Sequence, residues 1–307
     1  MLATGSVVAC ANERVVATAV EAAGSAQVLS GVTQVGPTSK LLYATRAYGP
    51  FLALETVSPD GTRLTRVTLD QNSYSAPAGS PDGRWIAYSS VVAGQGSIFV
   101  MRSDLTQVRQ LPSTTSFDGS PAWSPDGRRL AFVGTHASPF GTVGRLYVMD
   151  LEGQAVKQIT FDPTPGLFDS HSRPSWSHTG AEIAFRSMAG LERVRADGSA
   201  RQVISTTAPF CDAPSWSPVA AIIACSGADL TGEWQLYTLR PDGSDRRILV
   251  RSADQLVSPD WSPDGSELAF TRIENGVRTL YRISRTGTKE RPVHATPRDV
   301  LNPTWVR

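Results

Sequence analysis

The sequence contains few cysteines, few lysines and no long apolar run. Its cysteines, Cys10, Cys211 and Cys225, form no C-x-x-C pair, so a zinc or thioredoxin-type site has no support. Three of the 29 basic residues are lysines, and the arginines are scattered rather than gathered in a stripe, which argues against nucleic acid as a partner. No apolar run approaches the length of a transmembrane segment.

Motifs of the common enzyme classes are also missing. The chain has no Gly-x-Ser-x-Gly nucleophile elbow, no His-Glu-x-x-His, no phosphate-binding glycine-rich loop and no dinucleotide fingerprint. Such absences do not exclude a catalytic rim of acids and histidines, so an enzyme stays an alternative. The 26 glycines and 21 prolines suit many short strands and turns rather than long helices.

A repeated motif occupies most of the chain. Its clearest copy, Pro121 to Phe132, reads Pro-Ala-Trp-Ser-Pro-Asp-Gly-Arg-Arg-Leu-Ala-Phe. Tryptophan follows the anchor proline by two residues in every copy but one, where Gly79 stands instead. Repeats of about 44 residues predict a propeller or another repeat array. The anchor prolines are Pro77, Pro121, Pro174, Pro214, Pro259 and Pro303.

Each copy predicts a four-stranded unit. Ala122-Trp123-Ser124 indicates a short inner strand, Pro125-Asp126-Gly127 a tight turn, and Leu130 to Val133 the returning strand with one apolar face. A third strand rich in Leu, Tyr and Val and a polar fourth strand follow. Four strands are typical of a propeller blade. The Asp-Gly sites are interpreted as turns, because they lack the dense oxygen-ligand spacing of a calcium loop.

The two ends of the repeat region complete the count. Residues 41–68 supply three strands of a first blade without an inner strand, and Asn302 to Trp305 is an inner strand with nothing after it. We therefore predict an all-β fold, a six-bladed β-propeller of four-stranded blades closed by the C-terminal strand pairing into the first blade. The alternative takes residues 34–37 as the first inner strand and leaves a partial seventh blade.

These motifs resemble the WD40-like (PD40) repeat of the TolB family over residues 36–307. The resemblance implies a propeller, and with it a binding role in the bacterial cell envelope, periplasmic or lipid-anchored. The same repeat is similar to the propeller of prolyl oligopeptidase-type peptidases, whose catalytic domain would need about 250 further residues. TolB carries a separate N-terminal domain, and the first 35 residues here are too few to form one.

Residues 1–35 stand outside the repeat and are unassigned. Val7-Val8-Ala9-Cys10 is similar to the end of a lipoprotein signal, which is attached through its cysteine. The alternative is an N-terminal segment with an ordinary cysteine. Cys211 and Cys225 fall on neighbouring strands of one hairpin but are offset from direct pairing by a few residues. We therefore expect them not to be bridged, with a disulfide as the alternative.

The candidate site is the rim formed by the loops that enter the inner strands and those that join second to third strands. Aromatic, acidic and arginine side chains there can bind a protein or peptide, so we expect a non-catalytic monomeric scaffold without cofactor or metal. The alternatives are aspartates that only cap backbone amides, a metal held by the two histidines, and a sugar lyase or hydrolase. The candidate residues are Asp118, His136, Phe140, Asp169, His171, Arg173, Asp212 and Trp234.

Overall fold

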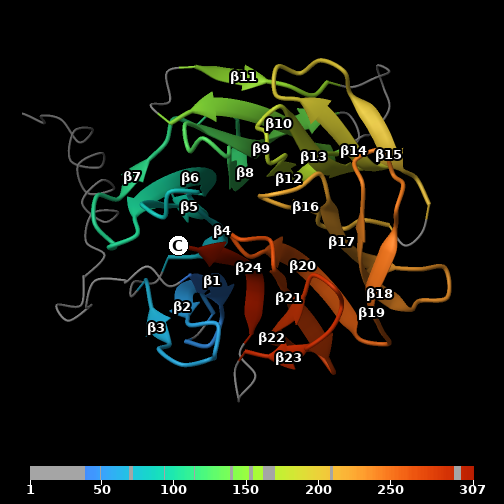
Figure 1. Ribbon diagram of the computed structural model, residues 1–307. Helices are drawn as coiled ribbons and strands as arrows, with labels where there is room; N and C mark the ends of the chain where they lie inside the picture. The colour runs from blue at the N-terminus through green and yellow to red at the C-terminus, as the bar shows by residue number, and fades with distance from the viewer. Residues whose placement is uncertain are drawn as a thin grey trace, which may run out of the picture.

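The computed structural model is built from β-strands arranged around a common axis (Figure 1). It describes residues 39–48, 50–68, 72–92, 94–113, 115–138, 141–151, 155–161, 170–207, 210–293 and 299–307. These ranges contain 24 strands and no helix. The expected all-β class is therefore confirmed, whereas residues 1–35, with the signal-like segment and Cys10, lie outside the described residues.

The strands fall into antiparallel units of four, each with an inner strand nearest the axis. The arrangement follows the repeat, since the tryptophan of a copy, or Gly79 in its place, ends or nearly ends each inner strand. The inner strands are β24 (Val300–Val306), β4 (Tyr74–Gly79), β8 (Phe117–Trp123), β12 (Ser172–Trp176), β16 (Ser215–Trp216) and β20 (Gln255–Trp261).

The other strands of each unit lie progressively farther from the axis. The second strands are β1 (Lys40–Thr45), β5 (Trp85–Val92), β9 (Arg129–Ser138), β13 (Glu182–Ser187), β17 (Ile223–Ala228) and β21 (Glu267–Glu274). The third strands are β2 (Ala53–Val57), β6 (Gln95–Arg102), β10 (Gly141–Asp150), β14 (Gly190–Arg195), β18 (Trp234–Leu239) and β22 (Val277–Ser284). The outer strands are β3 (Thr65–Arg66), β7 (Arg109–Gln110), β11 (Val156–Gln158), β15 (Gln202–Ser205), β19 (Arg247–Ser252) and β23 (Arg291–Pro292).

Strand pairing follows the chain except at two places. The units β12–β15, β16–β19 and β20–β23 are separate four-stranded sheets, and a parallel contact of Gly96 with Phe117 joins the units β4–β7 and β8–β11 into one eight-stranded sheet. In the remaining sheet the order is β24-β1-β2-β3. There the last strand pairs with the first, with Trp305 opposite Leu41 and Val300 opposite Thr45.

The Pro-Asp-Gly segments form turns held by their own side chains. In the third unit Asp126 Oδ1 accepts hydrogen bonds from Ser124 Oγ (2.5 Å) and Arg128 N (3.0 Å). Gly127 follows at φ 68°, a left-handed conformation that glycine adopts at little cost. Local hydrogen bonding thus accounts for these aspartates, as the turn interpretation predicts.

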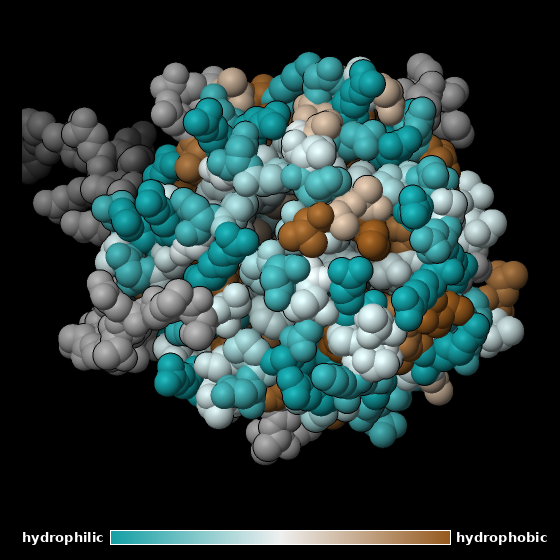
Figure 2. Space-filling view, viewed as in Figure 1, coloured by the Kyte–Doolittle hydropathy of each residue, from teal (hydrophilic) through white to brown (hydrophobic). Residues whose placement is uncertain are grey.

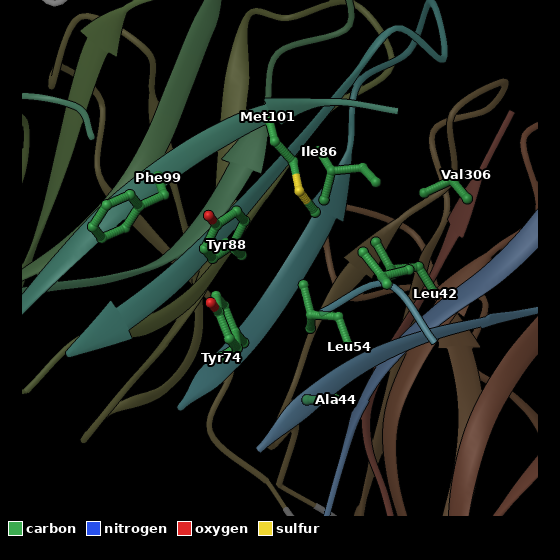
Figure 3. Packing of buried hydrophobic residues seen from close by; sticks show 10 residues of the cluster. Leu42, Ala44, Leu54, Tyr74, Ile86, Tyr88, Phe99, Met101 and Val306 are labelled. Carbon is green, nitrogen blue, oxygen red and sulfur yellow. The ribbon is translucent and has the colours of Figure 1, made fainter. Parts of the chain in front are cut away.

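Apolar side chains fill the spaces between neighbouring units. Figure 3 shows Leu42 and Leu54 of the first unit facing Ile86, Tyr88 and Met101 of the second. The two apolar positions predicted on each second strand are buried in every unit that carries the motif. Three of the five repeat tryptophans add a polar link, because their indole N–H donates to a carbonyl of the preceding unit. These bonds are Trp123 to Ala78 (3.0 Å), Trp176 to Ala122 (3.0 Å) and Trp261 to Ser215 (3.1 Å).

Candidate functional site

Antiparallel strands give the molecule two different ends. We call the end where the inner strands begin the rim end; it carries segments such as residues 46–52 and 210–214 and the hairpins between second and third strands. We call the opposite end the turn end, because it carries the turns at Pro125–Gly127 and Pro263–Gly265. The predicted site belongs to the rim end.

Two of the predicted residues, Asp118 and His136, gather around Tyr147. Asp118 is buried and accepts hydrogen bonds from Thr115 Oγ1 (2.5 Å) and Ser113 Oγ (3.2 Å). The Nε2 atom of His136 contacts the Tyr147 hydroxyl. Burial, and after it the charge of Asp118, raises the pKa of Tyr147, so this phenol stays protonated at neutral pH.

His171 is a packed interior residue. Its Nδ1 lies 2.8 Å from Thr160 Oγ1, its ring meets Phe185 edge-on with 5.0 Å between centroids, and its backbone N–H donates to Gly144. Only 1% of its surface is exposed, so the side chain holds the loop in place rather than facing solvent.

Asp212, Arg186 and Arg173 form a charged group at the junction of the fourth and fifth units. Asp212 Oδ1 accepts a 2.9 Å hydrogen bond from Arg186 Nη1, and both side chains are partly exposed. Their charges also reach Arg173, as their influence on its pKa indicates. Trp234 is half-buried against the packed cluster of the fifth and sixth units. Phe140 and Asp169 lie outside the described residues.

The rim end also holds most of the exposed apolar side chains. Of the eleven large apolar residues exposed among the described residues, nine lie on loops, hairpins or strand ends of this end. Val203 lies on an outer strand, and Val219 at the turn end. The nine are Tyr48, Phe51, Val91, Phe117, Phe161, Met188, Phe210, Leu230 and Val277.

Near the rim end a disulfide joins Cys211 to Cys225, with 5.0 Å between their Cα atoms. The expectation that these cysteines are not bridged was wrong. It assumed a regular hairpin, whereas the chain bends at Asp212 and Ala213 before β16 begins. The bend brings Asp212 N to Ser226 O (2.9 Å), which sets Cys211 beside Cys225.

A cavity of about 740 Å³ runs along the axis between the inner strands and reaches the turn end. The anchor prolines of all six inner strands line it, with Asp82, Asp126 and Arg307 at the turn end. The face in Figure 2 is mainly hydrophilic, with a recess near its centre. Sequence reasoning missed this site, although a proline at one position of six inner strands was a usable signal.

The residue before the anchor proline has an unusual backbone in five of the six inner strands. Each has a φ between 45° and 54°, the left-handed region, and the strand register shifts at the same point. Such bulges redirect side chains. The five residues are Ala76, Ser120, Arg173, Ser258 and Asn302, and all line the cavity.

Arg173 reaches across the axis from this level. Its Nη1 donates to Ser258 Oγ (2.8 Å) on β20 and to Asn302 Oδ1 (3.3 Å) on β24. Desolvation, partly opposed by the charge of Asp212, lowers the pKa of the guanidinium. Sequence reasoning placed Arg173 on the rim and missed Ser258 and Asn302, because it did not foresee the bulge.

Asp260 lies one level closer to the turn end, in the wall of the cavity. Its carboxylate accepts hydrogen bonds from Ser215 Oγ, Thr304 Oγ1 and Trp305 N, each 3.0 Å long. Burial raises its pKa to about 6, because desolvation outweighs these hydrogen bonds. Asp260 therefore links three units and is mostly ionised at neutral pH.

No membrane-crossing helix occurs in the part of the chain that the structure describes. The same ranges hold no group of three or more His, Cys, Asp or Glu side chains placed to bind a metal ion. His136 and His171 each have a protein partner instead, in Tyr147 and Thr160.

Comparison with known proteins identifies the repeat. The family model of the TolB beta propeller domain, PD40, matches residues 60–226. An uncharacterized protein of Agrobacterium fabrum is 34% identical over 125 residues, which cover 39% of this chain and 42% of that protein. The chain thus spans less than half of this curated relative.

Solved structures are similar in fold. TolB from Acinetobacter baumannii superposes with a TM-score of 0.74 at 21% identity, over 87% of this chain and 66% of that one. An oligogalacturonate lyase in complex with manganese superposes with a TM-score of 0.58 at 15% identity, over 83% and 73% of the two chains. At these identities the likeness shows the fold alone, which is a TolB-like propeller.

Proposed function

Because the chain belongs to the TolB beta propeller (PD40) family, we propose that it is a non-catalytic scaffold that binds a protein or peptide at its rim end in the bacterial cell envelope. In this proposal the propeller has six blades, closed where β24 joins the first blade. The support is the grouping of 24 strands into six units of four and the pairing of β24 with β1.

The exposed apolar side chains of the rim end carry the binding proposal. Apolar groups gathered on one face, with charged groups among them, are typical of surfaces that bind proteins. Met188 and Leu230 are 67% and 89% exposed, on hairpins of adjacent units, and Phe210 is 51% exposed on the segment between them. Arg186 and Asp212 supply charges at the same junction.

The other predicted residues enter the proposal with unequal roles. Phe140 and Asp169 lie outside the described residues, and we include them in the binding surface because the repeat pattern of the sequence assigns both to rim loops. Asp118, His136 and His171 bind other side chains of the fold, and we assign them to holding the loops in shape. Trp234 supports the hairpin that carries Leu230.

The Cys211–Cys225 disulfide supports the location. Disulfides persist in oxidising compartments such as the bacterial periplasm and are rare in the cytosol. An envelope location also agrees with the family of the propeller. Mass spectrometry of the protein from its native cells, with free thiols alkylated before lysis, would test it; alkylated Cys211 and Cys225 would contradict it.

The binding proposal is tested by selecting peptides from a displayed library on the wild-type protein. Met188→Ser, Phe210→Ser and Leu230→Ser, combined in one variant, should weaken binding of the selected peptides at least tenfold. The melting temperature should change by no more than about 2 °C, because all three side chains are exposed. Val203→Ser, half-exposed on outer strand β15, is the matched control and should bind as wild type.

Two results would contradict the proposal. If the triple variant bound the selected peptides as tightly as the wild type does, the rim surface would not be the binding site. Turnover of oligogalacturonates or related sugars that is lost in His136→Asn would instead favour the alternative, a lyase or hydrolase that uses acids and histidines of the rim. The fold likeness to an oligogalacturonate lyase is the observation that favours this alternative.

A further inference from the structure

The axial cavity is separate from the rim surface. It is lined by residues of the turn end such as Asp126 and Arg307, whereas the exposed apolar residues of the rim do not line it. Its volume of about 740 Å³ is in the range of small-molecule sites. At its inner end lies the level of Arg173, Ser258 and Asn302.

Arg173 uses only part of its hydrogen-bonding capacity. Both of its bonds to Ser258 and Asn302 come from Nη1, while Nε and Nη2 donate to no residue in the described ranges. The open edge of the guanidinium is the pair Nε and Nη2.

The charge of Arg173 also lacks a direct counter-ion among the described residues, since Asp212 pairs with Arg186 instead. A partly desolvated cation gains most from an anion that also supplies acceptors for its free N–H groups. A carboxylate fits, because its two oxygens match the parallel N–H groups of one guanidinium edge.

The walls of the cavity determine what chemistry the ligand can have beyond its carboxylate. Ten prolines, the six anchor prolines among them, and five tryptophans line the cavity, which gives rigid apolar sides. Asp260 stands in the wall between the turn end and Arg173, with its carboxylate bonded to three groups of the wall. It repels an anion at its own level. Arg307, the cation of the turn end, is exposed to solvent, so the level of Arg173 is the desolvated place for a carboxylate.

We propose that the axial cavity binds a small organic acid, with its carboxylate on the Nε–Nη2 edge of Arg173 and its apolar body against the proline walls. The site does not depend on the rim function. Entry is from the turn end, past Asp126 and Arg307.

Benzoate is the probe, and uncharged benzamide has the same shape. Titration calorimetry and ligand-observed NMR should show one benzoate per chain and at least tenfold weaker binding of benzamide. Arg173→Gln should weaken benzoate at least tenfold. Arg173→Lys, which keeps the positive charge but loses the two parallel N–H groups of the guanidinium, should weaken benzoate binding less. Arg128→Gln removes an exposed cation of the turn end outside the cavity lining and should bind as wild type.

The rim triple variant should also keep benzoate binding, which separates this proposal from the rim function. Equal affinity for benzamide, or benzoate binding unchanged in Arg173→Gln, would overturn the proposal. If Arg173→Gln fails to fold, crystals of the wild-type protein soaked in 4-bromobenzoate decide the question. Anomalous bromine density in the axial cavity supports the site, and its absence from the cavity overturns it.

Discussion

The two ends of the molecule are built by different rules. At the turn end the same Asp-Gly turn recurs, and its aspartates bond to neighbouring serine or threonine hydroxyls and backbone N–H groups. At the rim end the loops differ in length and composition, a disulfide ties the segment entering the fifth unit to the second strand of that unit, and apolar side chains face solvent. The repeated end specifies the fold, and the varied end is where units can differ in what they contact.

The largest expected effect concerns the disulfide of the rim end. Cys211→Ala with Cys225→Ala should lower the free energy of unfolding by about 3 kcal/mol, because a bridge over a 14-residue separation restricts the unfolded chain. Urea unfolding of the wild type with and without reductant, beside the double variant, measures it. Stability unaffected by both changes would mean that the rim end needs no covalent link.

The second effect concerns Asp260, which lies in the wall of the axial cavity between the two ends. The fold raises the pKa of Asp260 from 3.8 to about 6. Protonated Asp260 therefore stabilises the folded protein fully below pH 4, and this stabilisation is lost as the pH rises through 6. Asp260→Asn cannot ionise. Its free energy of unfolding relative to wild type should rise by about 2 to 3 kcal/mol between pH 4 and pH 7.

Urea unfolding of both proteins at several pH values in that window measures this difference. Thr304→Val, which removes one hydrogen bond to Asp260 without removing the carboxylate, is the control. It should keep a pH dependence of the same sign as wild type. A difference between Asp260→Asn and wild type that does not vary with pH would contradict the burial of an ionisable Asp260.

The smallest effect belongs to the turn end and has the opposite pH dependence. Asp264, four residues after Asp260, accepts bonds from Ser262 Oγ and Ser266 N, and the hydrogen bond from Ser262 is the main cause that lowers its pKa. Asp264→Ala should cost about 1 kcal/mol at pH 7. The cost should fade as pH drops below 4, since the contribution of wild-type Asp264 is lost on protonation.

Thermal unfolding at pH 7 and pH 2.5 measures this cost, because the lowered pKa keeps Asp264 ionised in the fold until the pH falls well below 3.8. Asp264→Asn keeps an acceptor for the turn and should recover part of the stability. A cost that is the same at both pH values would show that the turn does not depend on the charge of Asp264.

The features that could be predicted from the sequence are those fixed by short-range rules. Leu130 and Phe132 alternate with smaller residues after an Asp-Gly turn, so a strand with one buried face follows locally. The same rules missed the bulge before the anchor proline. A residue before proline usually adopts an extended conformation, yet Ser120 and Arg173 are left-handed where the register of β8 and β12 shifts.

The site was predicted only in part for the same reason. The rim could be placed from topology, and Asp212 does lie there beside an arginine. The sequence has no signal that Asp118 and His171 are turned inward, since that depends on which loop packs over which strand. The role of Arg173 depends on Ser258 and Asn302, residues 85 and 129 positions away, which only the tertiary fold brings within reach.

The pairing of β24 with β1 affects the order in which the units are completed during synthesis. Leu41 is synthesised more than 260 residues before Trp305, the residue it pairs with. During synthesis β1 therefore has an open edge while the other units complete their own sheets, and an open edge is a site for pairing with another chain. Among the described units, the one that contains β1 is begun first and is completed only when β24 is added. Chaperone dependence should therefore be greatest just before β24, residues 300–306, emerges.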